Sequence, residues 1–390
     1  MSATPRVMIV GAGIAGLTTA IALTNAGMDV TVLERAATVD DVAAGGGLVL
    51  WHNAMLAAKE LGLADSVAAA GHELRSHEFF SDRGRRLARW SVADMTERHG
   101  APACAIQRST LHRLLADTAG EVRFGARCVG VHGRPDHVVA ELSDGTGIVA
   151  DLCVGADGLR SAVRRALRGH EPPPRYAGYT AWQAVVDVPD ATVPEGTLVN
   201  MWGRGLRFLY FRLDDQGTVY WDGVTSDQVL ASTPPEPRAD ALLRRLFASW
   251  PAPVPQLIDS TPNEAILPVD IHDRPPVAGW TLDRVALVGD AAHPMTFNLG
   301  QGACQAIEDA VTLARCLLGD RDVTSALRNY ERRRRVRVAD IVRTSWTIGA
   351  IGRWRSRAAC RARDALMRAT FDRIAMRKSY ELMMNTGWER

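Results

Sequence analysis

The first regular pattern along the chain is a short apolar run at residues 7–10, followed by a glycine-rich turn at residues 11–16 and by helical periodicity. Gly27 ends that periodicity, and a second β-branched run at residues 30–33 leads directly to Glu34. A strand, a tight turn, a helix and a second strand in this order predict a βαβ unit. The turn has the GxGxxG spacing of dinucleotide-binding units.

Two further patterns divide the rest of the chain. Residues 74–92 alternate between charged and apolar side chains, which predicts half-exposed strands. Residues 176–278 alternate Trp, Tyr, Phe and Val, so we expect a mostly antiparallel sheet there with one helix at 238–249. A final apolar strand at 285–288 precedes a loop and a helix that starts at the glycines of 300–302. The predicted fold class is α/β, a Rossmann-like domain with an inserted antiparallel sheet and C-terminal helices.

Composition narrows the choice of partner. The 390 residues carry 46 basic and 44 acidic side chains, a net charge of +2, which gives no global field for nucleic acid. The six cysteines are scattered without CxxC spacing, so neither a metal site nor a disulfide framework is predicted. No targeting segment precedes the first strand, and we expect a cytoplasmic protein, monomeric or homodimeric, that acts on a small molecule.

The glycines and acids of these patterns suit a flavin dinucleotide. Gly11 permits the tight turn, Gly13 lets the backbone approach a pyrophosphate, Gly16 allows close helix packing, and Glu34 can accept from ribose hydroxyls. Asp290 leaves its strand as a fixed carboxylate for ribityl hydroxyls. The helix start after it offers free N–H groups and a positive dipole end to the N1–C2=O edge of a reduced flavin.

Three ordered motifs carry a family resemblance: GAGIAG with Glu34, GADG at residues 155–158, and Gly289-Asp290 with GQG at 300–302. Together they resemble the FAD-dependent aromatic hydroxylases, the single-component flavoprotein monooxygenases of the para-hydroxybenzoate hydroxylase type. Residues 175–182 and 202–207 are similar to a subgroup with urate hydroxylases and zeaxanthin-epoxidase-like enzymes. The division implied is an FAD-binding domain (1–73, 105–172 and 280–345), a substrate domain (74–104 and 173–279) and a C-terminal helical segment (346–390).

The resemblance implies bound FAD, NAD(P)H as a transient reductant because there is one GxGxxG motif, and O2 as co-substrate. Glu34 would hold the adenosine ribose, and Arg108 would lie along the pyrophosphate and ribityl chain. Asp157 would contribute to both FAD and NAD(P)H binding. The expected cofactor-binding residues are Gly11, Gly13, Ile14, Ala15, Gly16, Glu34, Arg35, Gly47, Arg108, Asp157, Gly158, Gly289, Asp290, Gly300, Gln301 and Gly302.

The activity implied is hydroxylation of an aromatic or conjugated small molecule through a flavin C4a-hydroperoxide. Alternatives are epoxidation of a polyene or quinone-type substrate, and a flavin dehydrogenase, oxidase or reductase without oxygen transfer. A flavoprotein that only sequesters a ligand is the non-catalytic alternative. The candidate catalytic residues are Arg207, Tyr220, Phe297 and His52.

The candidates differ in what supports them. Arg207 is placed on the sheet that faces the substrate, with Tyr220 and Trp221, and is the candidate to hold an anionic or carbonyl oxygen, although Arg and Trp on such a sheet more often only brace domain packing. Phe297 stands where the family usually has proline, which indicates either a reshaped pocket or a neutral loop variant. His52 follows the glycines of residues 45–47, which by resemblance run close to the flavin. His293 is interpreted as loop structure rather than as a general base.

The last part of the chain is strongly basic. Residues 343–378 carry ten Arg or Lys against two Asp, with apolar positions at helical spacing. We favour docking of these helices onto the rest of the protein over a membrane-surface helix that collects a greasy substrate. Residues 332–335, four successive arginines, are predicted to lie on a solvated helix face, because no stacking aromatics accompany them.

Overall fold

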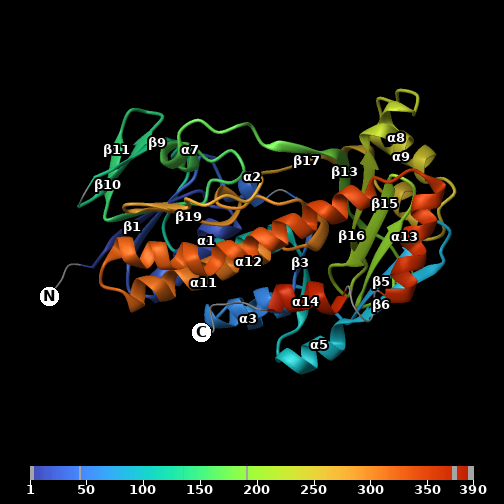
Figure 1. Ribbon diagram of the computed structural model, residues 1–390, viewed down its shortest axis with the longest axis horizontal. Helices are drawn as coiled ribbons and strands as arrows, with labels where there is room; N and C mark the ends of the chain where they lie inside the picture. Colours follow the sequence, from blue (N-terminus) through green and yellow to red (C-terminus); the bar gives the residue numbers. More distant parts are fainter. Residues whose placement is uncertain (1–3, 44, 135, 190–191, 371–375, 385–390) are drawn as a thin grey trace.

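The structure is a computed structural model that describes residues 4–43, 45–134, 136–189, 192–370 and 376–384. The molecule is elongated, with one large sheet in each half and long helices running along both (Figure 1). The first half carries a six-stranded sheet in the order β18-β19-β12-β1-β2-β8. Its strands are β1 (Arg6–Val10), β2 (Asp29–Leu33), β8 (Val122–Arg123), β12 (Leu152–Gly155), β18 (Thr281–Leu282) and β19 (Val285–Leu287).

All neighbouring strands of this sheet are parallel except β18 and β19. The predicted βαβ unit is present as β1, α1 (Ile14–Asn25) and β2. Strand β1 is an unbroken apolar run that is buried from its second residue on, as expected for a parallel strand covered on both faces. The α/β prediction with a Rossmann-like domain is therefore confirmed.

The second half is built on a seven-stranded sheet in the order β17-β13-β16-β15-β14-β5-β6, antiparallel except for the pair β14 and β5. Its alternating pattern gives two faces. Phe208 and Trp221 pack with Phe247 on one face, whereas their sequence neighbours face the other half of the molecule. The strands are β5 (Ser76–Ser81), β6 (Arg86–Ser91), β13 (Arg175–Asp187), β14 (Thr197–Trp202), β15 (Leu206–Arg212), β16 (Thr218–Ser226) and β17 (Leu267–Asp273).

The expectation of one helix between residues 176 and 278 was wrong. Three helices lie there: α8 (Asp227–Ala231), α9 (Ala239–Phe247) and α10 (Val254–Asp259). The first and third are too short to show helical periodicity, and prolines interrupt the sequence on both sides of Val254. Helices α9 and α10 cover the outer face of the seven-stranded sheet and bury its aromatic residues.

Two small sheets and several helices complete the first half. One sheet contains β3 (Gly47–Leu50), β4 (His72–Leu74) and β7 (Ala103–Gln107), and the other contains β9 (Cys128–Gly133), β10 (Val138–Leu142) and β11 (Gly147–Ala150). The helices are α2 (Val39–Ala43), α3 (His52–Glu60), α4 (Ala64–Ala70), α5 (Val92–His99), α6 (Arg108–Thr118) and α7 (Ala162–Arg168).

Long helices connect the two halves. Helix α11 (Gly302–Gly319) packs on α1, and α12 (Val323–Gly352) continues from there to the seven-stranded sheet (Figure 1). The last helices that the structure describes are α13 (Arg357–Thr370) and α14 (Met376–Met384). Helix α13 is docked, because the buried Arg363 donates to the Gly203 carbonyl at 3.1 Å and lies 5.2 Å from the ring of Trp202. The basic residue at 373 lies outside the described residues.

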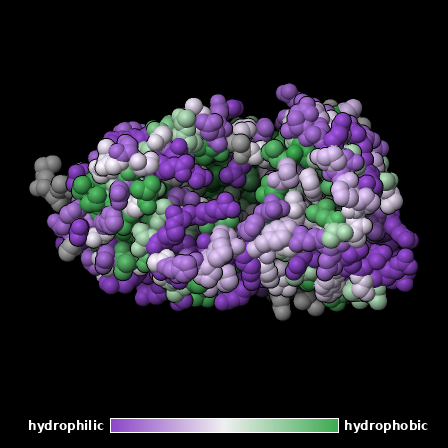
Figure 2. Space-filling view, turned by 90° about the horizontal axis from the view of Figure 1, so that it is seen from above, coloured by the Kyte–Doolittle hydropathy of each residue, from purple (hydrophilic) through white to green (hydrophobic). Residues whose placement is uncertain are grey.

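Seen from above, the surface is hollowed between the two halves, with hydrophobic side chains at the bottom of the hollow (Figure 2). Among the described residues, no helix combines the length and hydropathy that a membrane span requires. The boundaries proposed for the FAD-binding domain, the substrate domain and the C-terminal segment stay a prediction.

Candidate active site

The GxGxxG turn is held from inside the protein. A Cβ on Gly11 would lie 2.5 Å from the Ala156 carbonyl oxygen, and a Cβ on Gly16 would collide with Gly11 itself. Gly13 is different, because a Cβ there would meet no described protein atom within 4 Å. Gly11 and Gly16 are thus required by packing within the chain. The open surface at Gly13 is what close approach of a pyrophosphate requires.

Glu34 closes this turn at the end of β2. Its two carboxylate oxygens accept hydrogen bonds from the backbone N–H groups of Ala12 and Ala36, each at 2.8 Å. The side chain is buried, whereas Arg35 beside it is exposed. Glu34 therefore fixes the turn and the start of the next loop, next to the place where a ribose would lie. Ile14 and Ala15 form the first turn of α1 directly behind it.

Arg108, the first residue of α6, crosses the glycine turn of residues 45–47. Its side chain occupies the space that a Cβ on Gly45 would need. Within the described ranges its Nε atom is buried and has no hydrogen-bond partner. His112, one turn further along α6, contacts the Ala12 carbonyl oxygen at 2.6 Å. Helix α6 thus presents an unsatisfied guanidinium nitrogen beside the GxGxxG turn.

The GADG motif forms a helix cap. Asp157 accepts hydrogen bonds from the Ser161 hydroxyl and from the Ala162 backbone N–H, the latter at 2.6 Å, at the start of α7. Burial raises the pKa of Asp157, although these donors oppose the shift. Gly158 has φ of 76°, a left-handed conformation that favours glycine. The motif lies against Gly11, so the first and second motifs meet in space.

The third motif places Asp290 beside α1. Gly289 has φ of 55°, and a Cβ there would lie 2.6 Å from the Ala15 side chain, so only glycine fits. Asp290 is accessible to solvent yet closely surrounded by protein, as expected of a side chain that lines a deep hollow. This crowding raises its pKa, and the charges of His293 and Arg108 act in the opposite direction.

The helix start after this loop is rigid. Gly300 has φ of 61° and lies against the Trp51 ring, Gln301 precedes α11, and Gly302 is its first residue. The Gln301 side chain is fully buried and accepts from Asn53 at 3.0 Å, so it points into the protein. A Cβ on Gly302 would meet no described atom within 4 Å. The exposed backbone at this helix end is available to a ligand.

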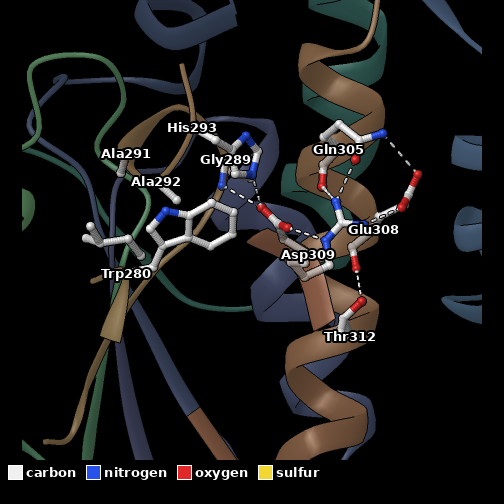
Figure 3. A network of polar contacts seen from close by, with 12 residues as sticks. Trp280, Gly289, Ala291, Ala292, His293, Gln305, Glu308, Asp309 and Thr312 are labelled. Atoms are coloured by element: carbon white, nitrogen blue, oxygen red, sulfur yellow. Dashed lines mark hydrogen bonds and ion pairs between the residues drawn. The ribbon is translucent and has the colours of Figure 1, made fainter. Parts of the chain in front are cut away.

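A buried ion network, not foreseen from the sequence, holds the third motif in place (Figure 3). Asp309 of α11 accepts from the Gly289 backbone N–H at 2.9 Å, contacts His293 Nε2 at 2.6 Å, and accepts from Arg334 Nε at 2.7 Å. Burial opposes ionisation of Asp309, but His293 and Arg334 outweigh it and lower its pKa to about 2. His293 is therefore a structural partner of the loop, as interpreted.

The same network corrects one prediction. Arg334, expected on a solvated face, is 1% exposed and also pairs with Glu308, which Arg337 contacts from the next turn. Both arginines fall on the buried face of α12 together with Tyr330 and Val338. Helical spacing from these two apolar residues was the signal that places Arg334 and Arg337 inside.

These residues fit an FAD molecule. The open backbone at Gly13, the unpartnered Arg108 Nε, the accessible carboxylate of Asp290 and the free end of α11 at Gly302 line one continuous region, because the three motifs contact one another. The first two match a pyrophosphate, the third a ribityl chain and the fourth an electron-rich ring edge. The described residues contain no cluster of His, Cys, Asp or Glu suited to a metal ion.

The predicted substrate side lies on the inner face of the seven-stranded sheet. Arg207 of β15 is buried, and its guanidinium carbon lies 5.5 Å from the Tyr179 ring and 5.9 Å from the Phe297 ring. Burial lowers the pKa of Arg207, and Tyr179 and Asp222 oppose the shift. Phe297, from the loop between Asp290 and α11, thus contacts the sheet where Arg207 emerges.

Tyr220 of β16 connects the seven-stranded sheet with the glycine turn of residues 45–47. Its side chain occupies the space that Cβ atoms on Gly46 and Gly47 would need, whereas Gly45 of the same turn contacts Arg108. The Tyr220 hydroxyl donates weakly to Asp222, at 3.4 Å. Asp222 was not among the residues predicted from the sequence. Only the pairing of β15 with β16 places it on the same face as Arg207.

His52 lies away from these groups. It is the first residue of α3, fully buried, with its ring edge-on to Tyr380 at 5.7 Å and its Nε2 3.5 Å from the Thr96 hydroxyl. Burial lowers its pKa to about 4, so it is neutral at physiological pH. The structure does not bring His52 together with Arg207, Tyr220 and Phe297, and nothing in its contacts supports a catalytic role.

Comparisons with known proteins agree with this geometry. Residues 4–345 match the family described as FAD binding domain. Aurachin C monooxygenase/isomerase of Stigmatella aurantiaca is 42% identical, covering 95% of this chain and 96% of the relative. FAD-dependent urate hydroxylase of Klebsiella pneumoniae subsp. pneumoniae is 34% identical, covering 86% and 88%. The crystal structure of Klebsiella pneumoniae HpxO with FAD and uric acid has a TM-score of 0.88 at 29% identity, covering 98% and 97%. This chain therefore belongs to the FAD-binding-domain family and is a flavoprotein monooxygenase of the FAD-dependent aromatic hydroxylase type.

Proposed function

We propose that this protein hydroxylates an aromatic or conjugated small molecule, using NAD(P)H and O2. The observation that carries the proposal is that the glycine turn of residues 45–47 contacts Arg108 at Gly45 and Tyr220 at Gly46 and Gly47. The cofactor-binding motifs and the charged face of the seven-stranded sheet are therefore adjacent. FAD, when bound, supplies the redox chemistry, and the C4a-hydroperoxide route implied by the resemblance is part of this proposal.

The side chains of this region have separate tasks in the proposal. Arg207 orients the substrate through an anionic or carbonyl oxygen. Phe297 and Tyr179, whose ring centroids lie 6.2 Å apart, exclude water from the reacting carbon. The start of α11 at Gly302 stabilises negative charge on the bound ring system through its dipole and free N–H groups.

The experiment that tests the proposal is turnover of the FAD-loaded protein under air. NADH or NADPH is added with a panel of phenols, hydroxylated heterocycles and polyenes, and nicotinamide oxidation, O2 consumption and product mass are measured. The expected result is nicotinamide oxidation that a ring-containing substrate accelerates, with a product one oxygen atom heavier. Failure to bind FAD, or absence of substrate-stimulated oxidation across the panel, contradicts the proposal. Its cytoplasmic location and its state as monomer or homodimer stay predictions.

A further inference from the structure

Asp222 is a buried carboxylate that the roles above leave unused. It lies on β16 with 3% of its surface exposed, on the inner face of the sheet. Among the residues that the structure describes, its hydrogen-bond donor is Tyr220, and at 3.4 Å the bond is long. A buried carboxylate normally has short, strong partners, since burying an unpaired charge is costly. Asp222 therefore keeps accepting capacity toward a ligand.

Arg207 is the nearest opposite charge. In the register of β15 with β16, Arg207 pairs with Val224 and Leu209 pairs with Asp222, so the two charged residues are diagonal neighbours. Diagonal positions are roughly 7–8 Å apart. Among the described residues, the ion pairs do not include one between Arg207 and Asp222. The two groups interact electrostatically, and their hydrogen-bonding atoms are not paired with each other.

The row of residues through Asp222 faces the cofactor-binding half, where Leu209 packs against the core. Gln183 of β13 pairs with Asp222 on one side and Leu209 of β15 on the other, and Asn200 of β14 continues the row. These three neighbours are only partly buried, in contrast to Asp222. A molecule lying on this row would reach Asp222 at its base.

Burial and two neighbouring side chains set the pKa of Asp222. Burial raises its pKa to about 7, and the charge of Arg207 and the hydroxyl of Tyr220 oppose that shift. Burial also raises the pKa of Tyr220 well above its usual value, so Tyr220 is a neutral donor. A carboxyl group with this pKa is half-ionised near neutral pH, which is the range in which a general base works best.

We propose that Asp222 accepts the proton of a ring hydroxyl or ring N–H of the substrate, while Arg207 holds an oxygen of the same molecule. The inference rests on the proposed hydroxylation. The O–H or N–H bond breaks, the proton moves to a carboxylate oxygen of Asp222, and the electron pair stays on the substrate, where it enriches the ring for attack by electrophilic oxygen. The substrate class is thus an aromatic ring that carries an ionisable donor together with an acceptor oxygen.

Binding to the FAD-loaded protein tests this without turnover. The probes are 4-hydroxybenzoate and 4-methoxybenzoate, which differ in the ring donor, and the readout is the change in flavin absorbance. Wild type should prefer the hydroxy compound by about tenfold at a pH above 7, the size of one charge-assisted hydrogen bond. Asp222→Asn and Asp222→Ser should lose this preference, and Asp222→Glu should recover part of it.

The matched control is Asp270→Asn, which removes an exposed carboxylate on β17 of the same sheet and should keep the wild-type preference. Equal preference in wild type and Asp222→Asn overturns the inference, as does failure of wild type to bind or to discriminate the probes. Bound FAD at the wild-type level shows that a variant is folded.

Turnover separates this inference from the proposed function. Wild-type hydroxylation should rise as pH increases through about 7, because only the ionised carboxylate accepts a proton. Asp222→Asn should lack that rise. Normal hydroxylation by Asp222→Asn overturns the assignment and leaves the proposed function standing. A lost binding preference in a protein that never oxidises NAD(P)H supports Asp222 as the acceptor and contradicts the proposed function.

Discussion

Three aspartates at the centre of this protein show how the same side chain acquires different properties from its surroundings. Asp309 is fully buried but is held ionised by His293 and Arg334. Asp222 is buried with a long hydrogen bond, and burial dominates its pKa. Asp290 is accessible and crowded, which suits a carboxylate that binds hydroxyls of a ligand. Their roles therefore follow from their partners rather than from their position in a motif.

Replacement of Asp290 tests the cofactor assignment. Asp290→Ala should weaken FAD binding by about tenfold or more, because it removes a charged acceptor of ribityl hydroxyls. The dissociation constant is measured by quenching of flavin fluorescence on titration into the apoprotein. The control is Asp117→Ala, which removes an exposed carboxylate of α6 in the same half of the molecule. Equal FAD affinity in the two variants contradicts the role of Asp290.

At the scale of elements, α11 and α12 act as the support of the third motif. Asp309 and Glu308 on α11 face Arg334 and Arg337 on α12, and all four are buried. Because Asp309 also accepts from the Gly289 backbone, the position of the Asp290 loop depends on the packing of these two helices. Removing one member leaves a buried, uncompensated charge, which is more damaging than removing the whole group.

Arg334→Met should therefore destabilise the protein by about 3–5 kcal/mol. In wild type, Asp309 has a folded pKa of about 2, below its unfolded value, so its contribution is present above the unfolded pKa and is lost as pH falls through about 2. Without Arg334 the folded pKa rises, so this contribution should be lost at a higher pH. Thermal unfolding as a function of pH measures both effects.

The control for this prediction is Arg335→Met, on the exposed side of the same helix. It should change the free energy of unfolding by less than about 0.5 kcal/mol, as surface substitutions usually do. An unfolding profile for Arg334→Met that matches Arg335→Met at every pH means that the network does not support the loop.

The same elements show what the sequence can and cannot predict. The βαβ unit and the strand before Asp290 were predicted correctly because a glycine turn and short apolar runs are local signals. Asp222 was missed because only the strand register places it beside Arg207, which lies 15 positions earlier in the chain. Arg334 was predicted to be solvated because a run of four arginines does not itself show which of them lies on the buried face of the helix. Local sequence patterns do not predict contacts between distant segments of the chain.

At the scale of the whole molecule, α12 contacts both the ion network that holds the cofactor site and the sheet face on which Arg207 lies. Arg334 lies in its first half, and Gly349 and Gly352 lie near its end. A Cβ on Gly349 would lie 2.7 Å from the Asn298 amide nitrogen and 2.9 Å from the Tyr179 hydroxyl. A Cβ on Gly352 would lie 2.9 Å from Arg207 Nε. Small residues here let the sheet approach the helix closely enough to fix Arg207.

Gly352→Ala tests whether the contact with α12 positions Arg207. Alanine favours a helix over glycine by about 1 kcal/mol, but crowding of the buried Arg207 costs about 1–3 kcal/mol, so thermal stability should stay level or fall slightly. The added methyl group must displace the buried Arg207 guanidinium, and we expect about a tenfold loss in the fraction of NAD(P)H oxidation coupled to hydroxylated product. FAD affinity should not change, because a Cβ on Gly352 would crowd Arg207, whereas the network that holds the Asp290 loop contacts α12 at Arg334. Coupling is measured as product formed per nicotinamide consumed.

Gly319→Ala is the matched control, since Gly319 ends α11 and a Cβ there meets no described atom within 4 Å. It should keep both FAD affinity and coupling. If Gly352→Ala is fully coupled, the guanidinium tolerates displacement, and Arg207 does not position the substrate through its contact with α12. If Gly352→Ala loses FAD instead, the strain has passed through α12 to the loop that carries Asp290 and Gly300, which contacts the helix at Ser345 and at Arg334 through Asp309. That result would make the helix a mechanical link between the two sites rather than a fixed wall.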